Sequence, residues 1–150
     1  MTLNASFEIA SSALAAHSER LKVHANNIAN MNTPYYQRKI PVLQAQTQEP
    51  FERVIARLQT PNGLIETGMM TDSGGVQVSG VMLDPTPGRR IYQPGHPEAD
   101  ADGFVTLSNV NPLSDMTDAI ESQRQYEANL AVVGIVKNMA NRAMDIGRQG

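Results

Sequence analysis

The sequence predicts a mainly α-helical fold with a small β region. Long N- and C-terminal helices should pair as an antiparallel coiled coil, joined by an extended middle segment that contains a β-hairpin. Both ends carry apolar residues at heptad-like spacing, and such a stripe on a helix requires another helix to cover it. Most prolines and glycines lie in the middle. We therefore expect an N-terminal helix with an Asn-rich signature (1–39), an extended middle region (40–111) and a C-terminal helix (112–150).

The first helix is expected from about Asn4 to about Met31, because Pro34 disfavours helical backbone in the residue before it. Its apolar stripe repeats every seven residues: Phe7, Leu14, Leu21 and Ile28. The alternate slot of the heptad holds weaker residues: Leu3, Ala10, His17, His24 and Met31. We expect the two histidines to fill an interface, with His24 half exposed. Their seven-residue separation does not suit two ligands of one zinc ion.

Short strands are expected in the middle region. The alternation from Gly75 to Leu83 predicts a strand with a kink at Gly80. Residues 89–92 and 104–107 are further strand candidates, and residues 51–58 fit either a helix or a strand. The fold of residues 41–88 is otherwise left open.

The last helix has the clearest boundaries. Asn111 is a good N-cap and Pro112 suits the first helical position, where a missing N–H costs nothing. Acidic residues gather in the early turns and basic residues in the late turns, as the helix dipole favours, and Gly147 is a candidate stop. The apolar pattern follows a three-four rhythm: Met116, Ala119, Tyr126, Leu130, Val133, Ala140 and Met144. Further apolar residues widen this face: Val132, Ile135, Val136, Met139 and Ile146.

Composition argues against several classes of protein. A net charge of −3 gives no basic field for nucleic acid. Without cysteine there are no disulfides, thiolate metal sites or cysteine nucleophiles. No stretch has the length and apolarity of a transmembrane segment, and the first residues do not resemble a cleavable signal peptide. With no Trp, three Phe and four Tyr, large apolar anchors are scarce. We expect a small core and helices that depend on contacts with other molecules.

No enzyme chemistry is predicted: no catalytic, cofactor-binding or metal-binding residue is assigned. The sharpest motif is residues 98–103, which place oxygen ligands at alternate positions and glycine sixth, like a calcium loop. The twelfth position, however, is Asn109 instead of glutamate, so a plain acidic turn is the favoured interpretation. A calcium-binding regulatory protein using residues 98–109 is the alternative from a different class, and a generic coiled-coil adaptor is a third.

The amide-rich run from Ala25 to Asn30, followed by Asn32-Thr33-Pro34, resembles the N-terminal signature of the bacterial flagellar axial family of rod and hook proteins. Residues 92–105 and 109–112, Met116 and residues 124–129 are similar to its proximal-rod type. The matching signature positions are Ala25, Asn26, Asn27, Ile28, Ala29, Asn30, Asn32, Thr33, Pro34, Pro94, Gly95, His96, Pro97, Asp100, Gly103, Asn109, Tyr126 and Asn129. The sequence departs from the family at Tyr35, where many relatives carry glycine.

The resemblance implies a structural subunit of the flagellar basal-body rod, which self-assembles helically with other rod proteins into the hollow drive shaft for motility. Another rod protein of the same axial family is the nearest alternative. The implied route is type III export without a cleavable signal, and the implied location is the periplasm. The implied partners are copies of the chain itself, other rod proteins, basal-body ring components and the export apparatus. The expected assembly interface is Phe7, Leu14, Leu21, Ile28, Met116, Ile120, Tyr126, Leu130, Val133 and Met139.

Overall fold

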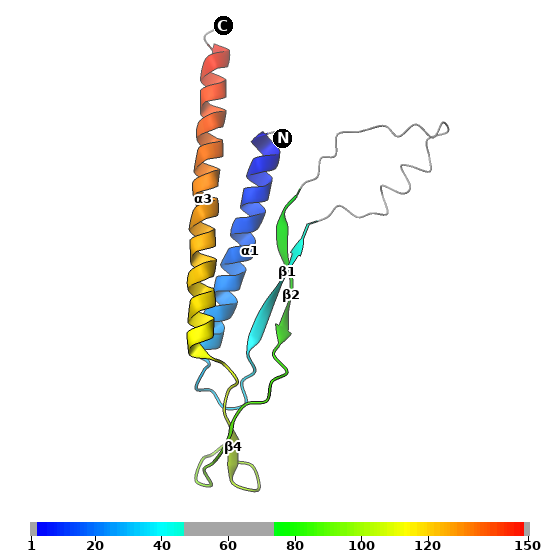
Figure 1. Cartoon of the computed structure of the whole chain (residues 1–150), viewed down its shortest axis with the longest axis vertical. Coiled ribbons are helices and arrows are strands. Elements are labelled where there is room, and N and C mark those ends of the chain that lie inside the picture. The colour runs from blue at the N-terminus through cyan, green and yellow to red at the C-terminus, as the bar shows by residue number, and fades with distance from the viewer. Residues whose placement is uncertain (1–2, 47–73, 149–150) are drawn as a thin grey trace, which may run out of the picture.

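The computed structural model describes residues 3–46 and 74–148, so the undecided element at 51–58 lies outside the described residues. The elements are α1 (Leu3–Ala29), β1 (Lys39–Ala45), β2 (Val76–Leu83), β3 (Arg90–Tyr92), β4 (Phe104–Thr106) and α3 (Pro112–Arg148). The two long helices run antiparallel, and the β1–β2 hairpin lies beside α1 (Figure 1). The predicted fold class, mainly helical with a small β region, is confirmed.

Local signals set the ends of the helices. The Asn111 side-chain oxygen accepts the N–H groups of Leu113 at 3.1 Å and Ser114 at 3.4 Å. The predicted cap is therefore present, and α3 begins at Pro112. The predicted stop at Gly147 is wrong, because the helix continues to Arg148. Among the described glycines only Gly103 has a positive φ, so Gly147 does not adopt the left-handed conformation that ends helices.

Small residues form the seam of α1 against the rest of the chain. The buried apolar residues of this helix are Ala10, Ala13, Ala16 and Val23. The heptad stripe that seemed strongest in the sequence lies on the flank of this seam: Phe7 is 46% exposed, and Leu14, Leu21 and Ile28 are half-buried. An α-helix has 3.6 residues per turn, so a seven-residue repeat drifts about 20° per heptad. The stripe therefore starts in solvent and approaches the seam toward the C-terminal end of α1.

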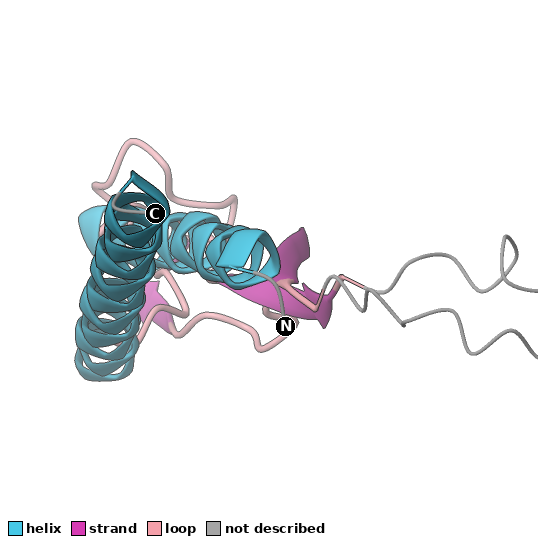
Figure 2. Ribbon diagram, turned by 90° about the horizontal axis from the view of Figure 1, so that it is seen from above, coloured by secondary structure: helices cyan, strands magenta, loops and turns pink. Residues whose placement is uncertain are grey.

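The helices lie closest where α1 ends and α3 begins. From there α1 leans away, so that the two ends marked N and C are well separated in both views (Figures 1 and 2). The upper half of α3 is accordingly exposed at most positions, with Val133, Val136 and Ala140 half-buried.

The two β-hairpins are short and antiparallel. In the first, Lys39 pairs with Leu83 and Ala45 with Val76, and the register shifts so that Val42 faces Gly80 and Leu43 faces Val78. The kink expected at Gly80 is therefore a bulge at Ser79–Gly80. Strand β1 was not predicted individually. It contains Pro41, which this sheet tolerates because both of its strands are edges.

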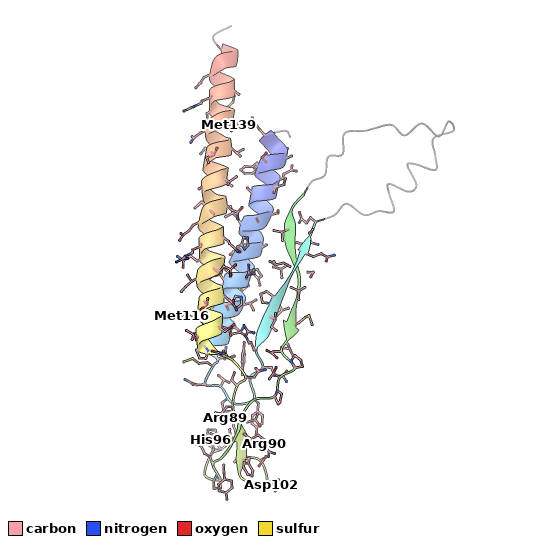
Figure 3. The ribbon with its side chains drawn as sticks, viewed as in Figure 1. Arg89, Arg90, His96, Asp102, Met116 and Met139 are labelled. Atoms are coloured by element: carbon pink, nitrogen blue, oxygen red, sulfur yellow. The ribbon has the colours of Figure 1, made fainter. Side chains whose placement is uncertain are left out.

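The second hairpin, β3–β4, extends beyond the lower ends of the helices (Figures 1 and 3). Val105 is 1% exposed. The rings of Tyr92 and Phe104 pack edge to face with centroids 5.2 Å apart. Gly103, with φ of 80°, closes the connecting turn, and a side chain there would collide with Tyr92 and Pro94.

Candidate functional site

A buried polar cluster joins the end of α1, the start of β1 and the start of α3. We call it the polar junction and define it as His24, Asn27, Arg38, Asp115 and Asp118. Asn27 and Asp115 have no exposed surface, and His24 is 4% exposed. The expectation that His24 is half exposed is wrong, because its ring enters the junction and lies 2.9 Å from the Asp115 carboxylate.

Asp115 is the acceptor at the centre of the junction. Its carboxylate accepts hydrogen bonds from Asn27 Nδ2 at 2.9 Å and from Arg38 Nε at 2.8 Å, in addition to its contact with His24. Burial alone raises the pKa of the Asp115 carboxyl, but the bonds from Arg38, His24 and Asn27 outweigh burial and hold that pKa below its ordinary value. The ionised form is therefore the one that the fold is built around.

Asn27 connects the end of α1 to the first residue of β1. Its Nδ2 donates to the Lys39 carbonyl oxygen at 2.8 Å, and its Oδ1 accepts the Lys39 N–H at 2.9 Å. The hydroxyl oxygen of Tyr36 lies 3.1 Å from the same Oδ1. The carboxamide thus substitutes for a neighbouring strand, since it satisfies both backbone groups of one residue.

Arg38 links the helices to both hairpins. Its guanidinium contacts Asp115 at 2.8 Å and Asp118 at 3.2 Å. Hydrogen bonding to Asp115 is the main reason that the pKa of Arg38 lies above its ordinary value. The Arg38 N–H donates to Asn109 Oδ1 at 2.6 Å, and Asn109 Nδ2 donates to the carbonyls of Asp84 and Thr86 at 3.2 and 2.8 Å. The junction therefore fixes where each segment leaves the helix pair.

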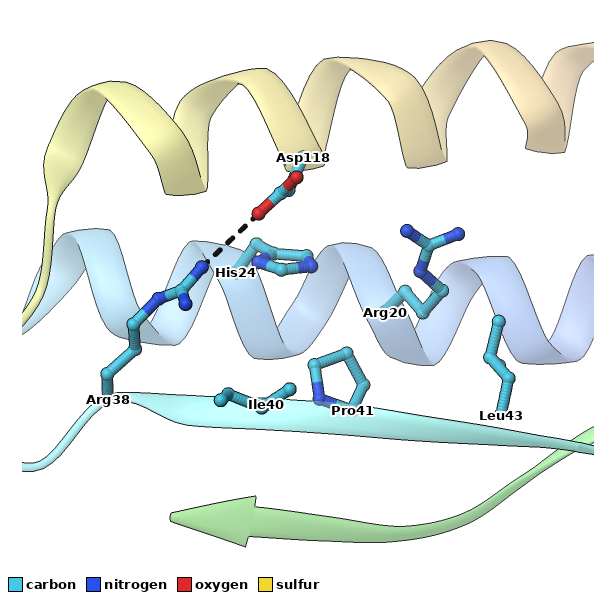
Figure 4. A pocket seen from close by; sticks show the side chains of 7 residues that line it. All are labelled: Arg20, His24, Arg38, Ile40, Pro41, Leu43 and Asp118. Carbon is cyan, nitrogen blue, oxygen red and sulfur yellow. Dashed lines mark hydrogen bonds and ion pairs between the residues drawn. The ribbon is translucent and has the colours of Figure 1, made fainter. Parts of the chain in front are cut away.

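The junction resembles a metal site only in its residue types. Ligand atoms of His24, Asp115 and Asp118 lie within 4.8 Å of one another, yet the Arg38 guanidinium already supplies the positive charge between the two carboxylates. Beside it lies a cavity of about 360 Å³, open to solvent, toward which the Arg38–Asp118 pair and His24 point (Figure 4). The cavity is lined by Arg20, His24, Arg38, Ile40, Pro41, Leu43 and Asp118. Both carboxylates of the junction are thus already paired with the Arg38 guanidinium.

The proposed calcium loop is a closed acidic turn. Asp100 Oδ1 accepts the N–H groups of Asp102 at 3.1 Å and Phe104 at 2.8 Å, and Oδ2 pairs with Arg90. These bonds, that from Phe104 foremost, lower the pKa of Asp100. Asn109, the twelfth position, bonds within the chain next to the polar junction. Asp100 and Asn109 are thus bonded to other groups of the chain.

The expected assembly residues on α3 are largely exposed: Met116 58%, Ile120 45%, Tyr126 37%, Leu130 52% and Met139 54%. Some of these residues, with Leu113, Val132 and Ile135, form two separate patches. The lower patch is Leu113, Met116 and Ile120; the upper patch is Val132, Ile135 and Met139. At about 100° of rotation per residue, Met116 and Ile135 point roughly 100° apart around the helix axis. Met116 and Met139 mark the two patches in Figure 3.

Much of the Asn-rich signature has a defined structural role. Asn30 Nδ2 caps the Asn26 carbonyl at 2.8 Å, and the Tyr36 hydroxyl donates to Asn26 Oδ1 at 2.9 Å. Tyr35 adopts φ of 58°, the left-handed conformation for which glycine is suited. Its hydroxyl donates to the Glu98 carbonyl at 3.0 Å, which ties this turn to the loop that follows β3.

Sequence reasoning missed Arg38, Asp115 and Asp118 as junction residues. Asp115 was attributed to the helix dipole alone, which explains an acidic residue in the first turn but not its complete burial. The available signal was the combination of an amide-rich helix end, an arginine soon after Pro34 and an acidic first turn in the last helix. None of the helices in the described ranges is long and apolar enough to cross a membrane.

Comparison with known proteins agrees with this geometry at both ends of the chain. Residues 7–37 match the family model "Flagella basal body rod protein", and residues 101–146 match "Flagellar basal body rod FlgEFG protein C-terminal". These segments contain most of α1, the Asn-rich signature and most of α3. Four of the five residues of the polar junction lie within the two matched regions, and Arg38 lies just outside them.

Three curated relatives are similar over nearly their whole length. The flagellar basal-body rod protein FlgC of Buchnera aphidicola (subsp. Acyrthosiphon pisum) is 34% identical over 97% of this chain and 98% of its own. Those of Yersinia enterocolitica and Bacillus subtilis are each 32% identical over 99% of this chain and 100% of their own. The chain belongs to the FlgC-type family of bacterial flagellar basal-body rod proteins, and its function is that of a structural rod subunit.

Proposed function

We propose that the chain assembles helically with copies of itself and with other rod proteins, and that the exposed apolar residues of α1 and α3 form the assembly interface. The role is purely structural and requires no catalytic activity or cofactor. The proposed site of assembly is the proximal rod in the periplasm, reached through the flagellar type III export apparatus, with basal-body ring components as further neighbours. The names of the relatives, flagellar basal-body rod proteins, support assembly into the rod.

The proposal is supported by a contrast between the small apolar side chains in the core and the large apolar side chains on the surface. Within the described residues, the buried apolar side chains are Ala10, Ala13, Ala16, Val23 and Val105. By contrast, Ile135 is 58% exposed and Met139 is 54% exposed. Burying such a side chain fully contributes about 1.5–3 kcal/mol, so the exposed apolar side chains of the described residues would stabilise the chain further on contact with other molecules.

The placement of the two α3 patches favours an open array. They lie at different heights on the helix and face different directions, so the contact that covers one is not the contact that covers the other. Interfaces of this kind are heterologous and build helical tubes when they do not close into a ring. Phe7, exposed at the end of α1 that leans away from α3, adds apolar surface at the upper level.

A charge placed in the upper patch tests the interface. Ile135→Asp or Met139→Asp should leave the chain folded, since both side chains are exposed, but should prevent rod completion because a carboxylate would be buried without a partner. Asn141→Asp is the matched control: it adds the same charge two residues beyond Met139, on an exposed side of the helix that faces away from the patch. Electron microscopy of basal bodies and swimming assays give the readout.

Leu21→Asp and Leu130→Asp test the originally expected stripe in the same way. Leu130 is 52% exposed and Leu21 is half-buried on the flank of the seam. Normal rods and motility in the Ile135 and Met139 variants would show that the upper patch is not an assembly surface. Equal loss of motility with Asn141→Asp would show that any added charge on α3 disturbs the chain. That result would contradict a specific role for the upper patch.

A further inference from the structure

A second concave surface lies between α1 and the β1–β2 hairpin. We call it the α1–β2 groove; its volume is about 360 Å³. It is lined by Glu19, Lys22, Val23, Asn26, Lys39, Val81 and Leu83. Val81 and Leu83 are 45% and 54% exposed. The groove is therefore an apolar trough with a polar rim.

The rim of the groove is net positive. Lys22 has a side chain that is 76% exposed and pairs with Glu19 at 3.3 Å. Lys39 lies over the Tyr36 ring at 5.7 Å and forms no ion pair among the described residues. With Glu19 matched by Lys22, the Lys39 ammonium is left as the unbalanced charge. A partner for this groove should present a small apolar side chain flanked by carboxylates.

The turn at the tip of the β3–β4 hairpin, residues 97–103, has this chemistry. Glu98 and Asp102 are exposed and form no ion pair within the described part of the chain, whereas Asp100 is paired with Arg90. Pro97 and Ala101 are exposed apolar residues beside them. The turn is also held in shape by its own bonds to Asp100 and by the Tyr35 hydroxyl, so little conformational entropy remains to be lost on docking.

We propose that the acidic turn of one copy docks in the α1–β2 groove of a second copy. The tip, where Asp102 is labelled, lies beyond the lower ends of the helices in Figure 3. Because the two complementary surfaces differ and lie at different heights, the contact is heterologous and repeats along an array. Opposite charges set its register and polarity.

This contact rests on the proposed assembly, and it adds a lateral bond that the helices alone do not supply. Because the chain contains no cysteine, cysteines introduced at two positions allow a direct cross-linking test. Cells lacking the native chain should co-express an Asp102→Cys and a Lys22→Cys variant; basal bodies are then isolated and treated with a short bismaleimide. A cross-linked dimer is expected when both variants are present, and only background when either is expressed alone.

Arg124→Cys provides the matched control, since Arg124 is also basic and exposed but lies on α3, outside the groove. With Asp102→Cys it should give no dimer. Charge reversal gives a second measurement: Glu98→Lys with Asp102→Lys should reduce incorporation of the chain into basal bodies, and adding Lys22→Glu with Lys39→Glu should restore it.

The outcomes separate the two proposals. If both cysteine variants are found in basal bodies but no dimer forms, or if Arg124→Cys links as well as Lys22→Cys, the docking proposal is wrong and the assembly proposal stands. If the native chain itself is absent from isolated basal bodies, both fail. A dimer specific to Lys22→Cys, with rescue by the charge exchange, supports docking of a second copy.

Discussion

The Asn27 amide donates a hydrogen bond of 2.9 Å to the Asp115 carboxylate, although the two residues are 88 positions apart in the chain. Neither has any exposed surface. Because the same amide also bonds both backbone groups of Lys39, one side chain holds α1, β1 and α3 in a fixed arrangement. Buried polar networks of this kind stabilise a fold when they are fully satisfied and destabilise it when one member is removed.

Asp115→Asn should destabilise the chain strongly. The substitution keeps the shape of the side chain but removes the charge that Arg38 contacts at 2.8 Å. Removing one partner of a buried pair costs about 3–5 kcal/mol, which urea unfolding followed by circular dichroism would measure. Asp118→Asn is the control, because that side chain is 36% exposed and its pair should contribute at most about 1 kcal/mol. Equal effects of the two substitutions would contradict a special role for Asp115.

Stability should fall in acid, and Asp115 should account for part of the fall. Its folded-state pKa lies below the ordinary value because the bonds from Arg38, His24 and Asn27 outweigh burial. The stabilisation is therefore complete above the ordinary aspartate pKa of about 3.9. It disappears as the pH falls through the folded-state pKa. The melting temperatures of the chain and of Asp115→Asn should converge as pH decreases. A constant difference between the two melting temperatures across that range would contradict a contribution from the Asp115 charge.

Tyr35 allows the cost of a left-handed residue to be measured directly. Its φ is 58°, and this conformation costs a non-glycine residue about 1–2 kcal/mol. Tyr35→Ala and Tyr35→Gly both remove the hydroxyl bond to Glu98, but only glycine relieves the backbone. We expect the alanine variant to unfold at a lower urea concentration than the glycine variant. Its free energy of unfolding should be lower by about 1 kcal/mol. Equal stability of the two variants would mean that the backbone at this position relaxes away from the left-handed region.

Gly88→Ala should distort the entry to the β3–β4 hairpin. A Cβ at Gly88 would collide with the carbonyl oxygen of Leu107, a backbone atom that cannot turn aside. Overpacking of this kind typically costs about 1–3 kcal/mol. Gly95→Ala is the matched control in the same hairpin, because a Cβ there meets nothing within 4 Å. The two unfolding curves should differ, and their coincidence would show that the hairpin moves freely relative to residue 88.

Local signals in the sequence were enough to predict both long helices. The Asn111 cap and Pro112 start follow from side-chain chemistry within one turn, and α1 ends two residues before the expected Met31. The β3 and β4 strands were likewise placed within one residue at each end. The resemblance to the rod family also came from the sequence, since its motifs are contiguous.

The packing could not be predicted in the same way. The Phe7 to Ile28 repeat indicates an apolar stripe, but not how far a straight helix rotates it away from its neighbour. The burial of the His24 ring depends on its contact with Asp115, which is 91 positions away in the chain. No local sequence pattern predicts that contact. Pro41 argues against a strand in the sequence of β1, because proline is disfavoured inside a sheet. It is accepted at an edge, and β1 is an edge strand.

The divergence of α1 from α3 makes the order of the upper helical segments depend on protein concentration. Where the helices separate, isolated helix is only marginally stable in water, and any neighbour that binds the ordered form stabilises it by mass action. In dilute solution the polar junction holds the lower ends of the helices together, whereas the upper segments of α1 and α3 stabilise each other little. In the proposed assembly, neighbouring copies would order these segments as they attach, so that helix ordering and attachment would occur together.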